Sequence, residues 1–268
     1  MSHSMEDKGL RIGLLFDLDG TLALTDHLHF EIFRDLLVKE GFAGGQPITK
    51  EFYQRNISGG SNDEILTRLF PGFTPQQRLE WAAFKEAYFR EQTVGKLSPV
   101  PGLEAFMAAF PPQGLWARRA TCLPAESPDR VRVEVVKVLV TNAPPANCTH
   151  MLHELGLTGT FQDQVVVDLV GCRGKPDPEP YQLAMTRSSL TPAHCVAFED
   201  SCTGVRSAHR AGVGAVVGLC TTHTPIQLKE AGATTLVDDW RGLLSAGAGV
   251  AYRSQMAALL GLEALWAE

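Results

Sequence analysis

Short β-rich apolar runs bounded by turn residues recur along this chain, and helical patterns separate most of them. The expected strands are Arg11–Phe16, Val135–Val140, Val165–Val170, Cys195–Phe198 and Val213–Leu219, with Thr234–Val237 as an edge strand. Runs that are apolar on both faces and separated by helices are typical of a parallel sheet covered on two sides. We therefore predict an α/β protein with a doubly wound parallel-sheet core.

A long stretch without a strong strand pattern lies between the first two predicted strands. The helical patterns in it are carried by Phe30, Phe33 and Leu37 and, further on, by Trp81, Phe84 and Tyr88. The stretch is too long for a crossover and too helical for a loop. We interpret residues 25–95 as a small helical cap domain inserted at the carboxyl ends of the strands, where such sheets bind ligands. Residues 1–24 and 96–268 then form the core.

One segment fits neither the strand nor the helix period. Residues 113–132 follow a helical pattern at Gly102–Phe110 that two prolines terminate. We predict a surface insertion there. A connection from a helix back into a parallel strand lies at the amino-terminal edge of the sheet, so we expect this insertion to lie opposite the ligand end and to leave the chemistry unaffected.

Two aspartates leave the end of the first predicted strand within one turn, in the run Phe16-Asp17-Leu18-Asp19-Gly20-Thr21. Alternation would place Asp17 and Asp19 on the same side, and Gly20 permits the tight bend that follows. Each carboxylate is costly without a partner, so a shared cation and substrate are expected. A solvated turn is one alternative. A calcium loop is another, although an EF-hand places its glycine later and draws its ligands from a loop between helices.

Further polar residues stand at later strand ends or directly before a helix. They are Thr141, Asn142, Lys175, Glu199 and Asp200. Together with the aspartate pair they provide a nucleophile, a hydroxyl and an amide for anionic oxygens, a cation and another carboxylate for a metal. This inventory suits phosphoryl transfer, which depends on charge neutralisation and positioning. Each of these residues alone would be an ordinary turn or strand-end residue, so the combination carries the inference.

These residues resemble the four motifs of the haloacid dehalogenase-like (HAD) superfamily: an aspartate pair, a Ser or Thr, a Lys and acidic residues. The matching motifs are Asp17-Leu18-Asp19-Gly20-Thr21, Thr141-Asn142, Lys175 and Glu199-Asp200, in the right order and across nearly the whole chain. The stretches Asn56–Asn62 and Lys175–Pro178 are most similar to the β-phosphoglucomutase-like branch, and particularly to plant-type sugar phosphatases. The resemblance implies a Rossmann-like core with a helical cap and a Mg²⁺-dependent phosphatase for small phosphorylated metabolites, expected to be sugar phosphates.

The resemblance also implies catalytic and metal-binding roles. Asp17 would attack phosphorus and form an aspartyl phosphate, while Asp19 would protonate the leaving group and then activate water. Mg²⁺ would be held by the Asp17 carboxylate, the Asp19 backbone carbonyl and the Asp200 carboxylate. Glu199 would orient the ligands or the waters of the metal.

Phosphate and substrate contacts are expected from the core and from the cap. Thr141 and the backbone amide of Asn142 would hold phosphate oxygens, and Lys175 would offset the charge between phosphate and nucleophile. The cap candidates are His29, Gly59, Gly60 and Asn62. His29 stands where mutases of this branch carry a histidine that acts on the catalytic aspartate. An exposed helix residue at His29 and a plain interhelical turn at the glycines are the alternatives.

Three other functions stay open. A phosphosugar mutase of the β-phosphoglucomutase type would need a cap arginine for a second phosphate, and only Arg55 stands near the substrate loop. A phosphonate hydrolase would need a cap lysine, for which Lys39, Lys50 and Lys85 are candidates by type. The third is a catalytically silent HAD-fold binding or regulatory protein, and the intact motif residues argue against it.

Net charge and hydropathy limit which partners and which cellular compartment are expected for this chain. The formal net charge is −6 without a Lys/Arg run, which argues against nucleic acid. No apolar stretch approaches the roughly 20 residues that cross a bilayer, and the first residues are polar, so we expect a cytoplasmic monomer or weak homodimer without a membrane partner. The six cysteines lack CxxC pairing, as is typical of free thiols. Cys148, His150 and His153 could suggest a zinc site, but the sequence offers no matching fourth ligand, so we expect no zinc there.

Overall fold

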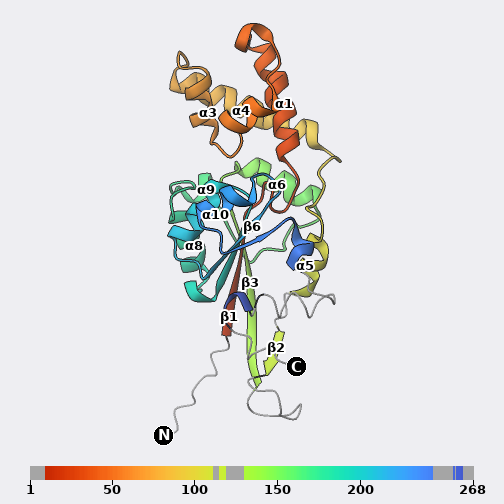
Figure 1. Ribbon diagram of the computed structural model, residues 1–268, viewed down its shortest axis with the longest axis vertical. Coiled ribbons are helices and arrows are strands. Elements are labelled where there is room, and N and C mark those ends of the chain that lie inside the picture. Colours follow the sequence, from red (N-terminus) through yellow and green to blue (C-terminus); the bar gives the residue numbers. More distant parts are fainter. Residues whose placement is uncertain (1–9, 111–114, 119–129, 244–255, 257, 262–268) are drawn as a thin grey trace.

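One sheet forms the centre of the computed structural model, which describes residues 10–110, 115–118, 130–243, 256 and 258–261 (Figure 1). Its strands are β1 (Leu10–Phe16), β2 (Leu115–Arg118), β3 (Arg130–Thr141), β4 (Asp163–Val166), β5 (Cys195–Glu199), β6 (Ala215–Leu219) and β7 (Thr235–Val237). The strand order is β2-β3-β1-β5-β6-β7, and β4 also pairs with β3. All pairs are parallel except the antiparallel pair β2 and β3. The predicted parallel-sheet core is confirmed.

Helices cover both faces of the sheet. One face packs against α5 (Leu103–Ala109) and α6 (Pro145–Glu154), and the other packs against α8 (Glu179–Arg187), α9 (Cys202–Arg210) and α10 (Pro225–Ala231). Neighbouring residues of β1 point to opposite faces, so Phe16 and Leu15 belong to two separate buried clusters. Both faces of the sheet are therefore apolar, as a doubly wound fold requires.

The expected strand Val165–Val170 is wrong in its second half. β4 ends at Val166, and Val167–Val170 forms the short helix α7. β4 pairs with β3 from Val138 to Thr141, where β3 ends, so none of the described strands continues beside the residues after Val166. The β propensity of valine expresses packing on a pleated surface, and it does not maintain a strand without a partner.

Two strand segments, β2 and the start of β3, lie within residues 113–132, and the surface insertion expected there stays a prediction. β2 pairs with Arg130–Val133 at the start of β3, and residues 119–129 lie outside the described part of the chain. β1 first pairs at Leu10 with Val133, so this hairpin extends past the amino-terminal end of β1. Figure 1 shows it at the bottom of the molecule, far from helices α1, α3 and α4. The expected location, opposite the ligand end, agrees with this arrangement.

A group of helices lies between β1 and α5 in the sequence. They are α1 (Asp26–Lys39), α2 (Lys50–Asn56), α3 (Asn62–Leu69) and α4 (Pro75–Thr93), followed along the chain by α5. Helix α4 packs on α1 and α3, and the group stands above the carboxyl ends of the strands (Figure 1). That residues 25–95 act as a separate cap domain stays a prediction.

The helix expected around Trp81, Phe84 and Tyr88 is confirmed as α4. The buried face of α4 runs through Trp81, Lys85 and Phe89, spaced four residues apart, whereas Phe84 is 57% exposed. Phe84 thus lies on α4 outside its buried face, where a lysine takes the central position. Capping boxes start α3 at Ser61 and α4 at Thr74.

Phe16 provides a test of the core. Its ring lies 5.0 to 6.1 Å from four other aromatic rings, Phe106, Phe161, Phe198 and Trp240. We expect Phe16→Ala to lower the free energy of unfolding by about 3–5 kcal/mol, measured by urea denaturation, because it leaves a cavity in a packed cluster. Phe84→Ala is the matched control on an exposed face and should change stability by less than about 0.5 kcal/mol. Equal losses in both variants would contradict this account of the core.

Candidate active site

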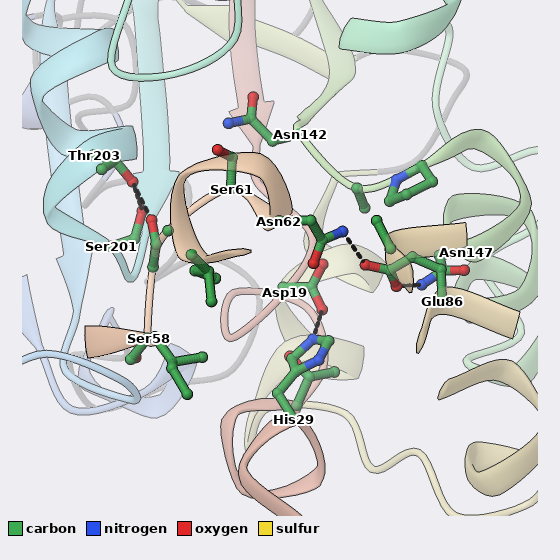
Figure 2. Close-up of a pocket in the computed structure, with 18 of the residues that line it drawn as sticks. Asp19, His29, Ser58, Ser61, Asn62, Glu86, Asn142, Asn147, Ser201 and Thr203 are labelled. Atoms are coloured by element: carbon green, nitrogen blue, oxygen red, sulfur yellow. Dashed lines mark hydrogen bonds and ion pairs between the residues drawn. The ribbon is translucent and has the colours of Figure 1, made fainter. Parts of the chain in front are cut away.

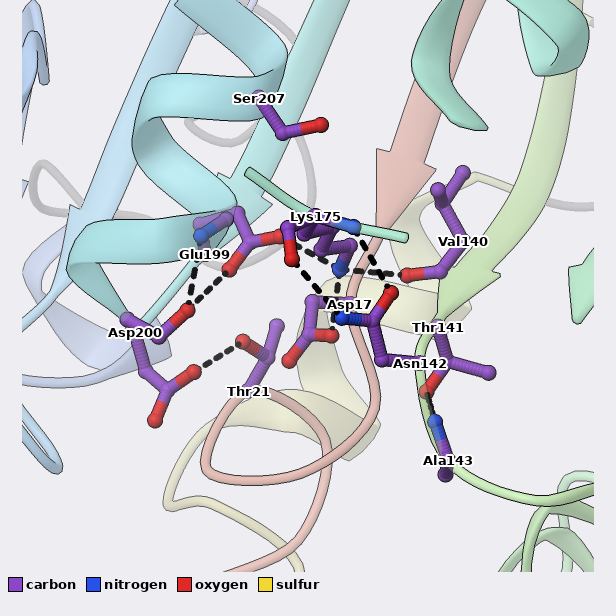
Figure 3. A network of polar contacts seen from close by, with 12 residues as sticks. Asp17, Thr21, Val140, Thr141, Asn142, Ala143, Lys175, Glu199, Asp200 and Ser207 are labelled. Carbon is purple, nitrogen blue, oxygen red and sulfur yellow. Dashed lines mark hydrogen bonds and ion pairs between the residues drawn. The ribbon is translucent and has the colours of Figure 1, made fainter. Parts of the chain in front are cut away.

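Carboxylates from neighbouring strands meet at the carboxyl end of the sheet. Asp17 follows β1, and Glu199 and Asp200 stand at the end of β5, which pairs with β1. One oxygen from each of the three carboxylates lies within 4.8 Å of the others, and all three residues are buried. Among the described residues this is the acidic group that could hold a metal ion. Figure 3 shows these side chains converging between the two strands.

Lys175 places its ammonium between two of these acids. Its Nζ lies 2.7 Å from Asp17 Oδ1 and 2.6 Å from Glu199 Oε1, and it donates to the Val140 carbonyl at 2.8 Å (Figure 3). Burial alone would lower the pKa of Lys175, but the charges of Asp17 and Glu199 outweigh burial and raise it. The lysine is therefore charged, and it offsets negative charge that would otherwise be buried without a partner.

Glu199 is fixed from several sides. The Tyr181 hydroxyl donates to Glu199 Oε1 at 2.6 Å, and the Ser201 hydroxyl donates to Oε2 at 3.3 Å. A Cβ on Gly204 would lie 1.9 Å from Oε2, so the glycine leaves the space that the carboxylate occupies. Neither Tyr181 nor Gly204 was predicted from the sequence as a site residue. Their positions in helical patterns look like those of ordinary core residues.

Thr141 and Asn142 complete the core side of the site. Thr141 is the last residue of β3, is buried, and accepts a hydrogen bond from the Ala143 amide at 2.9 Å. Asn142 exchanges two hydrogen bonds with the backbone of Lys175, at 3.1 and 3.2 Å. The amide side chain of Asn142 therefore positions the loop that carries the lysine. That task was not predicted from the sequence.

Asp19 is turned away from the acidic cluster. Its Oδ1 lies 3.2 Å from His29 Nε2, and the His29 ring stacks on Phe89 with centroids 4.6 Å apart. The Asp19 carboxylate is not part of the acidic cluster, because it is hydrogen-bonded to His29 of α1. That the backbone carbonyl of Asp19 binds the metal stays a prediction.

The two aspartates also differ in their electrostatic surroundings. Burial raises the pKa of Asp17 to about 7, although Lys175 opposes the shift. Burial would also raise the pKa of Asp19, but the hydrogen bond and charge of His29 outweigh burial and lower it. The pKa of Asp200 lies well above its ordinary value because of burial and the charge of Asp17. The Asp17 and Asp200 carboxylates are thus stable as anions mainly when a cation is near them.

A cavity of about 630 Å³ lies between the acidic cluster and helices α1 to α4. With the exception of Glu199, every predicted site residue lines it: Asp17, Asp19, His29, Gly59, Gly60, Asn62, Thr141, Asn142, Lys175 and Asp200. Glu199 lies behind Lys175, fully buried. Arg55 does not line the cavity, whereas Lys85 does. The size is in the range of small-molecule sites.

A polar network that was not predicted from the sequence lies on the helical side of the cavity, the side lined by residues of α1 to α4. Glu86 Oε1 accepts hydrogen bonds from Lys85 at 2.8 Å and from Asn62 at 2.7 Å, and Oε2 accepts one from Asn147 at 2.6 Å (Figure 2). Arg90 donates a hydrogen bond to the side-chain oxygen Oδ1 of Asn147 at 2.6 Å. Burial would raise the pKa of Glu86, but the charge of Lys85 outweighs it and keeps it low. The network joins α3 and α4 to α6.

The other sequence candidates do not form a site. His150 Nε2 is hydrogen-bonded to the Thr93 hydroxyl, the His153 side chain is 80% exposed, and Cys148 is buried. The described cysteines are free thiols, and Cys122 lies outside the described residues. Among the described helices, none has the length and hydropathy needed to span a bilayer.

Comparison with known proteins assigns the family. Residues 13–212 match the family model "haloacid dehalogenase-like hydrolase". The "Phosphorylated carbohydrates phosphatase" of Thermotoga maritima is 31% identical over 229 residues, which cover 84% of this chain and 93% of that protein. The "Validoxylamine A 7'-phosphate phosphatase" of Streptomyces hygroscopicus subsp. limoneus is 28% identical and is covered over 89% of its length, with 81% of this chain aligned.

The fold of a solved relative agrees with this assignment. The crystal structure of CbbY from Rhodobacter sphaeroides in complex with phosphate superposes with a TM-score of 0.65 at 23% identity, covering 86% of this chain and 95% of CbbY. The chain belongs to the haloacid dehalogenase-like hydrolase family. The predicted resemblance is confirmed, and the chain is a hydrolase.

Gly204 tests how tightly Glu199 is held. An alanine inside helix α9 would normally stabilise the protein relative to glycine. Because the added Cβ would meet the Glu199 carboxylate, we expect Gly204→Ala instead to lower the free energy of unfolding by about 1–3 kcal/mol in chemical denaturation. Gly72→Ala is the matched control, since a Cβ there meets nothing within 4 Å. A Gly204→Ala protein as stable as the wild type would show that Glu199 is free to move.

Proposed function

We propose that this chain is a Mg²⁺-dependent phosphatase that hydrolyses phosphoric monoesters of small carbohydrates through an aspartyl phosphate at Asp17. The observation that carries the proposal is the convergence of Asp17, Lys175 and Asp200 at one end of a cavity that helices α1 to α4 also line. Phosphoryl transfer depends on such positioning and charge neutralisation. The relatives add support, since two of them are named for phosphorylated carbohydrates and for validoxylamine A 7'-phosphate.

The acidic cluster fits a Mg²⁺ ion. Asp17 and Asp200 would hold it, with the backbone carbonyl of Asp19, because Mg²⁺ prefers oxygen ligands. Burial and mutual repulsion raise the pKa values of Asp17 and Asp200, and a divalent cation is the group that reverses such a shift. When bound, the ion would neutralise developing charge on the phosphate oxygens. Glu199 is already engaged by Lys175 and Tyr181, so we assign it to holding the lysine.

The reaction would proceed in two displacements at phosphorus. Asp17 attacks, the bond from phosphorus to the ester oxygen breaks, and the proton shared between His29 and Asp19 passes through the Asp19 carboxylate to the leaving alkoxide. Asp19 then takes a proton from water, the water oxygen attacks the phosphorus, and the bond to Asp17 breaks with release of phosphate. Lys175 offsets the charge that accumulates between nucleophile and phosphate, while Thr141 and the Asn142 amide hold the phosphate oxygens. His29 holds the Asp19 carboxylate in place between the two steps.

Helices α1 to α4 would act as the cap of this enzyme. We assign to them the exclusion of bulk water and the recognition of the leaving group, through His29, Gly59, Gly60 and Asn62. The Gly59 carbonyl already accepts a hydrogen bond from Thr203 at 3.4 Å, which brings this loop to the core. A mutase would need a cation for a second phosphate. Arg55, the candidate for it, lies outside the cavity lining, so hydrolysis is favoured.

Replacement of the nucleophile tests the mechanism. We expect Asp17→Asn to lower phosphate release from sugar monophosphates at least about a thousandfold, as loss of a nucleophile does in other enzymes. Asp35→Asn, an exposed acid on α1 that pairs with Arg34, is the control and should keep wild-type turnover. Acid-quenched wild-type enzyme should carry a phosphoryl group on the peptide containing Asp17. Retained turnover in Asp17→Asn would show that the nucleophile is misassigned.

Removal of the metal tests the cation site without an activity assay. Chelator-treated protein should gain stability when Mg²⁺ is added, by about 2.7 kcal/mol at a hundred times Kd, equivalent to several degrees in Tm. Asp200→Asn should lose most of that gain because one ligand is missing, whereas Asp35→Asn should retain it. If Mg²⁺ stabilised Asp200→Asn as much as the wild type, the cation would bind at a site that does not include Asp200.

A further inference from the structure

The basic residues that line the cavity are already paired with carboxylates. Among the described lining residues, the lysines and arginines are Lys175, Lys85 and Arg78. Lys175 is held by Asp17 and Glu199, as described above. Lys85 Nζ lies 2.8 Å from Glu86 Oε1, and Arg78 Nε lies 2.6 Å from Asp63 Oδ1. On the helical side, each cation therefore has its own anion before any substrate arrives.

Aspartates and glutamates outnumber lysines and arginines in the same lining by seven to three, and His29 is the histidine among them. The acids are Asp17, Asp19, Asp26, Asp63, Glu86, Asp168 and Asp200. A Mg²⁺ ion would offset two of the four excess negative charges, and it would lie at the phosphate end of the cavity. Clefts lined by one sign of charge repel ligand groups of that sign, and low-dielectric walls strengthen the effect. The end that faces the leaving group stays negative.

Neutral polar groups provide the remaining contacts at that end. Figure 2 shows Ser58, Ser61 and Asn62 around the helical side of the cavity, with Asn142 and Thr203 among the core residues. Hydroxyl and amide groups exchange hydrogen bonds with sugar hydroxyls without requiring a charge. They cannot compensate a buried carboxylate or a second phosphate of a substrate, which would need a free Lys or Arg.

We propose that this cavity selects phosphoric monoesters whose leaving group is neutral or cationic, such as a polyol, a sugar or an amino sugar, and rejects those with a second anionic group. The proposal rests on the proposed phosphatase function and adds the charge of the leaving group to it. The specificity-determining residues are Asp63 and Glu86, because they neutralise the cations that would otherwise attract the second anion.

Substrates that share one carbon skeleton and differ in charge test the selection. We would measure kcat/KM for phosphate release with Mg²⁺ from glucose 6-phosphate, glucosamine 6-phosphate and 6-phosphogluconate. The neutral and cationic esters should fall within about tenfold of each other, and 6-phosphogluconate should be at least about a hundredfold poorer, because its carboxylate meets an acidic wall. Equal turnover of the three esters overturns this inference and leaves the phosphatase function intact. Release from none of them contradicts the phosphatase function, and this inference with it.

Two variants test the residues themselves. Asp63→Asn should free Arg78, and Glu86→Gln should free Lys85, so each should raise the ratio of kcat/KM for 6-phosphogluconate to that for glucose 6-phosphate by about tenfold. The Asp63 side chain is 72% exposed, so its variant should fold even where Glu86→Gln does not. Asp35→Asn removes an acid paired with Arg34 outside the cavity, and its ratio should equal that of the wild type. An unchanged ratio in Asp63→Asn overturns the assignment of Asp63, and an unchanged ratio in both variants overturns the inference.

Discussion

The ion pair of Lys175 with Asp17 and Glu199 is the interaction on which the site depends. Three buried carboxylates at the ends of two neighbouring strands would repel one another strongly, and the desolvation of each adds to the cost. The Lys175 ammonium, 2.6 to 2.8 Å from two of these carboxylates and the Val140 carbonyl, compensates part of it. The remaining negative charge is what a bound divalent cation would offset. The fold thus keeps the Asp17 carboxylate inside the protein without neutralising it completely.

The residues that hold this ion pair come from several elements of the core. Asn142 fixes the backbone of Lys175, Tyr181 donates to Glu199, and Gly204 leaves space for the Glu199 carboxylate. These residues follow β3 or lie on α8 and α9, so the geometry of the site is set by packing of helices on the sheet. Helices α1 to α4 contribute neutral polar groups, two closed ion pairs and further carboxylates to the cavity. In the proposed function, the core provides the charge for the reaction, and α1 to α4 select the leaving group.

The strands of the core and the site residues at their ends could be predicted from the sequence because short local patterns mark them. Strand ends at Phe16, Val140 and Phe198 are marked by the switch from apolar to polar residues, and parallel pairing brings these ends together. The polar residues on the helical side of the cavity were harder to predict. Glu86 and Asn147 could not be identified because a charged residue on a helix ordinarily faces solvent, and only tertiary packing places Glu86 inside. The hairpin of β2 and β3 and the early end of β4 likewise depend on which strands lie beside them, which a single sequence does not state.

Asn147 occupies an unusual chemical position between the two halves of the molecule. Its amide nitrogen donates to Glu86 and its oxygen accepts from Arg90, so one planar group serves an anion and a cation at the same time. An aspartate of the same shape would suit the arginine and repel the glutamate, and a leucine would leave both charges without this neutral bridge. Both bonds join α4 to α6, so a separation of these two helices would break them together. Glu86 would then keep its bonds to Lys85 and Asn62, whereas Arg90 would lose the Asn147 oxygen.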